Sequence, residues 1–212
     1  MGFDKLFAII AGRPVIAHAI DAFQQANSVA EIIVVAGEDR HDEIRKMSRD
    51  ESFKKVRSII TGGERRQDSV RAGLESLSLD ARYVAVHDAA RPLVRPEQIE
   101  RVFEQCQVHG AAVLAEPISD TLKRADVDLM VADSVDRHRL YAMQTPQIFE
   151  WALIEEAYRA VFANRVSVTD EVSAVERLGR KVFLVPTEDF NFKITYPRDL
   201  TLAEFVLKQR MH

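Results

Sequence analysis

An aspartate and an arginine directly follow an apolar run in the segment Val84-Ala-Val-His87-Asp88-Ala89-Ala90-Arg91-Pro92. If the run is a strand, both charges lie at its carboxyl end, where open α/β sheets bind their ligands. A carboxylate there can hold a divalent metal beside a triphosphate, and a guanidinium can pair with phosphate oxygens. We therefore expect phosphoryl chemistry at Asp88 and Arg91. The alternative is that Asp88 caps the following turn and Arg91 is a surface cation. His87 would point away from Asp88 on an alternating strand, which favours a structural role for it.

A second candidate segment begins with two adjacent glycines, Gly62 and Gly63, after the strand-like run Val56 to Thr61 and before a helix-like stretch. Adjacent glycines let the backbone pass close to a flat ring or a phosphate, and free amides at a helix start can bind oxygen atoms. A nucleotide could bind here. An ordinary glycine turn before a helix with solvated arginines explains the segment equally well.

A third candidate is Lys193, in the segment Asn191-Phe-Lys-Ile-Thr195, which we predict to be a strand before a helix that begins at Pro197. The neighbours of Lys193 are apolar, and a buried lysine is costly unless it is paired. We expect an anionic partner, either a carboxylate of the protein or a bound phosphate.

Size and charge limit the class of protein. The chain has 212 residues, of which 47% are hydrophobic and 29% charged, which fits one domain over residues 1–212. Its formal net charge of -4 gives no general attraction to nucleic acid, so we expect a small anionic ligand held by locally placed cations.

Cysteine content and hydropathy point to the cytoplasm. The single cysteine, Cys106, excludes a disulfide framework and a cysteine-based zinc site within one chain. No apolar run has the length of a membrane span, and the first residues do not resemble a signal peptide. We expect a cytoplasmic protein with no membrane partner.

Short β-branched runs alternate with amphipathic stretches along the chain. The predicted strands are Glu31 to Ala36, Val56 to Thr61, Tyr83 to His87, Ala111 to Ala115 and Val182 to Val185. The predicted helices are Val15 to Gln25, His41 to Met47, Gln67 to Leu77, Pro96 to His109, Glu150 to Phe162, Thr169 to Leu178 and Pro197 to Met211. Because the strands are apolar on consecutive positions, we predict a three-layer α/β/α domain with helices on both faces of the sheet.

One region interrupts this alternation. Ile118 to Arg124 and Leu129 to Asp136 are predicted to be two polar strands around a turn, within an arm over about 117–143. A two-stranded hairpin is marginal alone and gains stability by packing against a second copy, so we expect a homodimer.

Together, the motifs resemble one family. The segments Gly62-Gly-x-x-Arg-x-x-Ser-Val, His87-Asp-Ala-Ala-Arg-Pro, Leu140-x-x-x-Gln-Thr-Pro-Gln147, Thr169-Asp-Glu171 and Asn191-x-Lys-Ile-Thr195 occur in the order and spacing of 2-C-methyl-D-erythritol 4-phosphate cytidylyltransferase. The resemblance runs from about Lys5 to the carboxyl end. It implies a Rossmann-like nucleotidyltransferase fold with a mixed, mostly parallel sheet, and transfer of CMP from CTP to methylerythritol phosphate.

The resemblance also implies roles for individual residues. Nucleotide contacts would come from Gly62, Gly63, Ser69, Asp88 and Ala89, with Asp88 facing Mg²⁺. Contacts to methylerythritol phosphate would come from Arg91, Thr121, Arg137, Thr145, Thr169 and Lys193, with Thr121 and Arg137 reaching into the partner subunit of the homodimer. The catalytic residues would be Lys5, which stabilises charge on the α-phosphate, Lys193, which positions the attacking phosphate, and Arg137.

The amino-terminal region departs from the family pattern. Family members carry a strand and a glycine-rich loop before the lysine that Lys5 matches, whereas this sequence starts at Met1-Gly2. We expect an upstream segment with that loop. Without it we expect weaker CTP binding, a slower reaction, and unpaired edges where a central strand would lie.

Two other functions remain open. A cytidylyltransferase for another polyol phosphate, such as ribitol 5-phosphate, would share much of the nucleotide-binding half. A non-catalytic relative of the same fold would dimerise without binding CTP.

Overall fold

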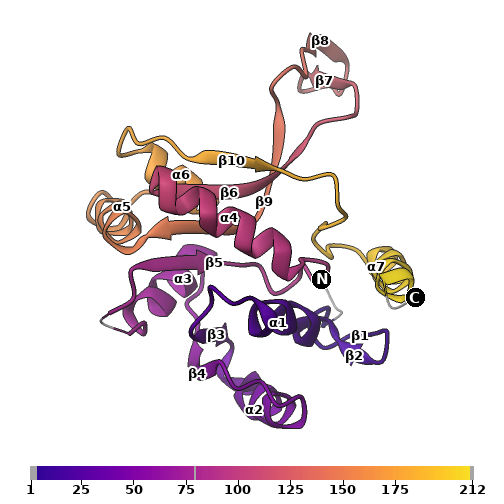
Figure 1. The fold of residues 1–212 in the computed structure, drawn as a ribbon. Coiled ribbons are helices and arrows are strands. Elements are labelled where there is room, and N and C mark those ends of the chain that lie inside the picture. The colour runs from indigo at the N-terminus through magenta and orange to yellow at the C-terminus, as the bar shows by residue number, and fades with distance from the viewer. Residues whose placement is uncertain (1–3, 79, 211–212) are drawn as a thin grey trace.

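Helices and strands alternate along most of the chain in the computed structural model, which describes residues 4–78 and 80–210 (Figure 1). The helices are α1 (Val15–Gln25), α2 (His41–Asp50), α3 (Arg66–Glu75), α4 (Pro96–His109), α5 (Trp151–Ala163), α6 (Glu171–Glu176) and α7 (Pro197–Arg210), with a 3-10 turn at Glu38–Arg40. The strands are β1 (Ile9–Ile10), β2 (Arg13–Pro14), β3 (Ile32–Ala36), β4 (Val56–Thr61), β5 (Tyr83–Val86), β6 (Ala111–Pro117), β7 (Leu122–Ala125), β8 (Val131–Val135), β9 (Tyr141–Glu150) and β10 (Phe183–Pro186).

Apart from the exceptions given below, the predicted helices and strands are confirmed, with bounds that differ by a few residues at most. Helices α1 and α4 have the predicted bounds, and Met211, the predicted end of the last helix, lies outside the described residues. Helix α4 is delimited by local chemistry. Pro96 occupies its first turn and Gly110, with φ of 79°, ends it in the left-handed region that favours glycine.

The main sheet has the strand order β10-β6-β9-β5. β10 is parallel to β6, and β6 and β5 are both antiparallel to β9, so β9 alone runs against the other strands of this sheet. Alternate residues face opposite layers. Ala112 and Leu114 of β6 pack with α4, whereas Ala111 and Val113 pack with α5 and α6. The predicted three-layer arrangement and mixed α/β class are therefore confirmed.

β3 and β4 form a separate parallel pair below the main sheet in Figure 1. Within the described residues, β3 has no ladder with β5, and a cavity of about 740 Å³ lies between them. The cavity lining is largely apolar, and includes Ile16, Phe23, Val34, Val35, Leu74, Val84 and Ile99.

Three local predictions were wrong or incomplete. Strand β9 was not predicted, because its buried Gln144, Thr145 and Gln147 read as polar. Leu6-Phe-Ala8, directly after Lys5, resembles a strand in sequence, but Leu6 and Phe7 lie in a turn. The segment 191–195 is not a strand. The buried Asn191 side chain donates to Gln144 Oε1 and Thr145 O, both at 2.9 Å, and the Ile194 N–H donates to Ala90 O at 2.8 Å. These hydrogen bonds fix the segment without a strand ladder.

The predicted arm is present as the antiparallel pair β7 and β8, which projects from the main sheet beyond the ends of β6 and β9 (Figure 1). Apolar side chains at its tip are open to solvent, with Val127 97% and Leu129 85% exposed. In the described part of the chain, no helix has the length and hydrophobicity needed to cross a membrane.

Candidate active site

The carboxylate of Asp88, just beyond the end of β5, lies among three cationic side chains. Arg66 Nε donates to Asp88 Oδ1 at 3.1 Å, and Lys193 Nζ donates to Asp88 Oδ2 at 3.1 Å. Arg91 Nε lies 3.8 Å from Oδ2. These cations come from three separate segments of the chain, so the fold gathers positive charge around one carboxylate. We call these four side chains the Asp88 cluster.

The cluster keeps Asp88 ionised. Burial by itself would raise the pKa of this carboxyl group, but the charges of Arg66 and Lys193 outweigh burial and lower the pKa to about 2. The three cations of the cluster face two carboxylates, Asp88 and, through Arg66, Glu171. The surplus positive charge suits the cluster to bind phosphate oxygens.

Thr145 and His87 form a chain of hydrogen bonds with the backbone of Asp88. The backbone N–H of Asp88 donates to Thr145 Oγ1 at 3.1 Å, and Thr145 Oγ1 lies 2.9 Å from His87 Nδ1. His87 Nε2 lies 3.1 Å from the carbonyl oxygen of Arg91, which can only accept, so Nε2 carries the proton of a neutral ring and Nδ1 accepts from Thr145. His87 is therefore structural, as predicted.

This arrangement differs from the role expected for Thr145. Its side chain is buried, and its single hydroxyl proton is engaged with His87. In this structure Thr145 contributes to the site through the position of Asp88, and its contact with methylerythritol phosphate stays a prediction.

The two glycines are explained by packing inside the protein. A Cβ on Gly63 would lie 2.4 Å from Asp68 Cβ, and a Cβ on Gly62 would lie 2.7 Å from Ser69 Oγ. Ser69 Oγ also accepts from the backbone N–H of Gly63 at 3.1 Å. The start of α3 therefore packs tightly against this turn at Gly63, where a side chain does not fit, whereas at Gly62 the close contact is with the end of the Ser69 side chain.

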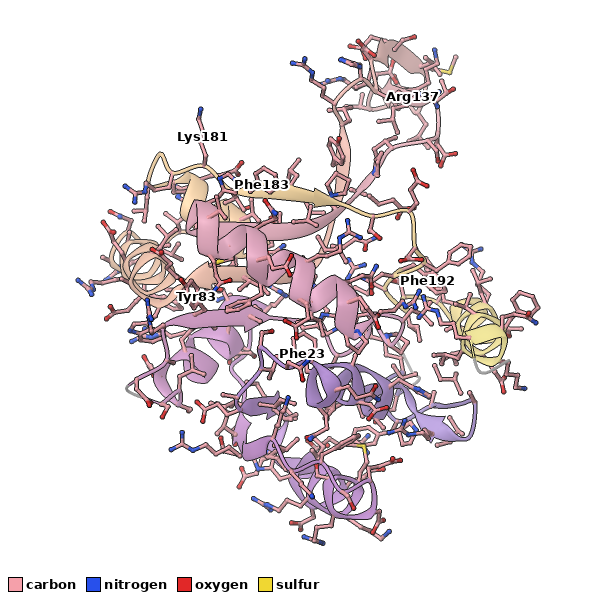
Figure 2. All side chains as sticks on the ribbon, in the orientation of Figure 1. Phe23, Tyr83, Arg137, Lys181, Phe183 and Phe192 are labelled. Atoms are coloured by element: carbon pink, nitrogen blue, oxygen red, sulfur yellow. The ribbon has the colours of Figure 1, made fainter. Side chains whose placement is uncertain are left out.

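Arg91 and Lys193 reach the cluster in different ways. The Arg91 side chain is 12% exposed, and its Nη1 donates to the carbonyl oxygen of Asn191 at 2.8 Å. The expectation that Lys193 is buried is wrong, because its side chain is 40% exposed. Of the two partners expected for this lysine, the structure contains the carboxylate, Asp88. Neighbouring Phe192, labelled beside α7 in Figure 2, packs in the apolar cluster that includes Ala203 and Val206 of α7.

The other predicted residues lie in three places. Ala89 is half-buried beside Asp88, and Lys5 is half-buried in the amino-terminal turn. Thr169 is exposed on the segment that leads into α6, where its hydroxyl contacts Ser173. Thr121 and Arg137 are exposed on the arm, which carries Arg137 away from the main sheet (Figure 2).

Two residues of the network around Asp88 were not among the predicted site residues. Arg66 Nη1 and Nη2 donate to the two carboxylate oxygens of Glu171 at 2.6 and 2.9 Å, and Glu171 is fully buried. Both residues belong to the motifs quoted above, Arg66 to the double-glycine segment and Glu171 to Thr169-Asp-Glu171. The motifs therefore include both residues, but the sequence does not show that Arg66 and Glu171, 105 positions apart, form an ion pair.

A magnesium ion fits this site only together with its substrate. The described residues contain no group of three or more His, Cys, Asp or Glu side chains that could hold a metal. Mg²⁺ commonly takes one or two carboxylates and completes its shell with substrate phosphates and water. Asp88 can supply one such carboxylate, provided that Arg66 or Lys193 gives up one of its oxygens.

Comparisons with known proteins agree with this geometry. The family described as 2-C-methyl-D-erythritol 4-phosphate cytidylyltransferase matches residues 1–209. A protein of that name from Dehalococcoides mccartyi strain CBDB1 is 38% identical over 98% of this chain and 90% of its own length. One from Halalkalibacterium halodurans is 37% identical over 99% and 91%.

Solved structures agree as well. The crystal structure of 2-C-methyl-D-erythritol 4-phosphate cytidylyltransferase from Thermus thermophilus has a TM-score of 0.82 at 34% identity, over 96% of this chain and 93% of that one. The 4-diphosphocytidyl-2C-methyl-D-erythritol synthase from Anaerococcus prevotii has a TM-score of 0.85 at 28% identity, over 94% and 88%. With its sequence, its fold and its cationic site in agreement, the chain belongs to the 2-C-methyl-D-erythritol 4-phosphate cytidylyltransferase family.

Proposed function

We propose that the Asp88 cluster is where this family member performs its reaction, the transfer of CMP from CTP to 2-C-methyl-D-erythritol 4-phosphate in isoprenoid precursor biosynthesis. The products are 4-diphosphocytidyl-2-C-methyl-D-erythritol and pyrophosphate. The observation that carries the proposal is the ionised Asp88 carboxylate held among Arg66, Arg91 and Lys193 at the carboxyl end of β5.

In this reaction an oxygen of the methylerythritol phosphate attacks the α-phosphorus of CTP, and the bond to pyrophosphate breaks. Two anionic phosphates must approach each other, so cations that offset their repulsion and fix their geometry supply most of the rate. Lys193 and Arg91 would bind the attacking phosphate, and Lys5 would stabilise charge on the α-phosphate. Gly62, Gly63, Ser69 and Ala89 would contact the nucleotide.

We also propose Mg²⁺ as the metal ion. Held by Asp88 and the triphosphate, it would neutralise phosphate charge and orient the pyrophosphate leaving group. Release of Asp88 from Lys193 on metal binding would free that lysine for the attacking phosphate.

The arm is proposed to complete the acceptor site of a second subunit in a homodimer. Thr121 and Arg137 are exposed on the arm, whereas Arg91 and Lys193 lie at the Asp88 cluster. An arm that packs on a partner would bring Thr121, Arg137 and the acceptor phosphate together with Thr169. A cytoplasmic location and the absence of a nucleic-acid partner remain predictions.

The first experiment measures pyrophosphate release from CTP, Mg²⁺ and methylerythritol phosphate. We expect Asp88→Asn and Lys193→Ala each to lower kcat/KM by about 100-fold, because each removes a charge that acts on the reacting phosphates. Lys181→Ala is the matched control, since Lys181 is exposed at the far end of the main sheet (Figure 2), and should be neutral. Equal effects of Lys193→Ala and Lys181→Ala would contradict the site assignment.

The assay should be run on the 212-residue chain and on a form extended upstream by a family glycine-rich loop, because that loop is expected to contribute to CTP binding. Ribitol 5-phosphate is the alternative acceptor. Faster turnover with ribitol 5-phosphate than with methylerythritol phosphate would overturn the assignment of the acceptor. Neither form turning over either acceptor would favour the non-catalytic relative.

A further inference from the structure

Glu171 is a buried carboxylate that the reaction described above does not use. Its side chain is 0% exposed, and it is the first residue of α6. Arg66 donates to both of its oxygens, and the hydroxyl of Tyr158 donates to Oε1 at 2.9 Å. An isolated buried carboxylate is unfavourable, so this set of donors is what permits Glu171 to be there.

Arg66 joins Glu171 to the Asp88 cluster. Its guanidinium is a rigid plane, so fixing Nη1 and Nη2 on Glu171 also fixes the direction of Nε. Nε is the atom that donates to Asp88 Oδ1. The three side chains therefore form one continuous line of charge-assisted hydrogen bonds from the core to the site.

The segment around Glu171 is itself held firmly by buried amide side chains. Gln147 Nε2 donates to Asp170 Oδ2 at 3.0 Å, and its Oε1 accepts from the backbone N–H of Val172 at 3.2 Å. Gln67 Oε1 accepts from the N–H of Val168 at 2.9 Å. Glu171 thus has a fixed position relative to both α3 and β9.

We propose that Glu171 is a positioning residue for the cytidylyl transfer: it aims Arg66 so that Asp88 is held in the orientation needed for the metal and the triphosphate. The inference depends on the proposed function, because it assigns Glu171 to the same site. It predicts that loss of Glu171 acts on the site through Arg66, beyond any general loss of stability.

The first test is kinetic. Glu171→Gln keeps the size of the side chain and removes the charge that holds both Nη atoms. We expect kcat to fall about 10- to 100-fold, as is typical when the supporting partner of a site residue is lost. Added to Asp88→Asn, the same change should cost little more, because both act on one unit. Arg66→Lys keeps the charge, loses the planar fork, and should lower kcat to a similar extent.

Tyr158→Phe is the matched control. It removes a hydrogen bond to the same buried carboxylate and keeps both hydrogen bonds from Arg66, so Tm should fall while kcat stays within about twofold. If Glu171 were purely structural, Glu171→Gln and Tyr158→Phe would both lower Tm and leave kcat of the folded protein unchanged. This result would overturn the proposal.

The second test does not need turnover. A crystal structure of the Glu171→Gln variant measures the separation of Arg66 Nε from Asp88 Oδ1, which is 3.1 Å in the parent. Loss of this hydrogen bond is the expected result. An unmoved Arg66 with its hydrogen bond to Asp88 intact would overturn the proposal. Because this measurement is independent of activity, failure of the assay alone would count against the proposed function and not against the positioning.

Discussion

The hydrogen bonds of Thr145 and His87 fix the backbone position of Asp88, and His87 can be protonated in acid. Burial lowers the pKa of His87 to about 4, despite its hydrogen bond with the carbonyl oxygen of Arg91. The neutral ring accepts from Thr145, which in turn accepts from the Asp88 backbone. A proton on Nδ1 would oppose the Thr145 proton, so protonation at His87 disturbs the support of Asp88.

Stability should therefore decrease in mild acid. A histidine whose folded pKa is depressed contributes stability that is present above the unfolded value of about 6.5 and is lost as pH falls toward 4. We expect the free energy of unfolding to drop by on the order of 2–3 kcal/mol across this range. Denaturant titrations at several pH values measure this, and His87→Gln should flatten the profile. A parent curve that does not change between pH 7 and pH 4 would contradict the buried neutral ring.

At the scale of elements, the turn between β4 and α3 is determined by how closely α3 approaches it. Gly63 faces the Cβ and backbone of Asp68, the residue whose side chain accepts from the Arg65 N–H at 3.2 Å and caps the helix. Gly73, in the last turn of α3, faces only the Val35 side chain, at 3.3 Å. Val35 lines the cavity between β3 and β5 and has room to move.

These two glycines should respond differently to alanine. Gly63→Ala should destabilise the protein by about 1–3 kcal/mol, because the start of α3 must shift. Gly73→Ala should be neutral or stabilising by up to about 1 kcal/mol, since alanine is the better helix former. Urea unfolding of both variants measures the difference, and equal losses would mean that the turn is not tightly packed.

For the molecule as a whole, the arm is notable because it has no hydrophobic core of its own. Only two short strands form it, and its tip exposes Val127, Leu129, Met130 and Val131. Exposed apolar groups on a protruding hairpin favour burial against another chain. A second copy of this chain is the partner that would also bring Thr121 and Arg137 to an acceptor site.

Sedimentation velocity tests this assembly. The parent should sediment as a dimer, and Leu129→Glu combined with Met130→Glu should sediment as a monomer, because charges would replace the apolar tip. Val108→Glu is the control, since Val108 is an exposed apolar residue on α4, 73% exposed and away from the arm. A monomeric parent, or a dimer that survives the arm variant, would exclude the arm as the interface.

The sequence by itself determined most of the helices and strands, and it singled out Asp88, Arg91 and Lys193 as candidate site residues. Pro96 and Gly110 delimit α4 through local backbone preferences, and the apolar run before Asp88 is a strand because its residues favour extended backbone and burial. Such signals act over a few residues, so they can be read from the order of residues alone.

The tertiary structure decided which polar residues are buried and what they contact. Gln147 and Thr145 lie on a buried strand because partners from other elements satisfy their hydrogen bonds. Arg66 meets Glu171 across 105 positions of sequence, and Lys193 meets Asp88 across the same separation. The free energy of a buried charge depends on the partner that the fold brings to it. For that physical reason, the contacts within the Asp88 cluster could be found only from the tertiary structure.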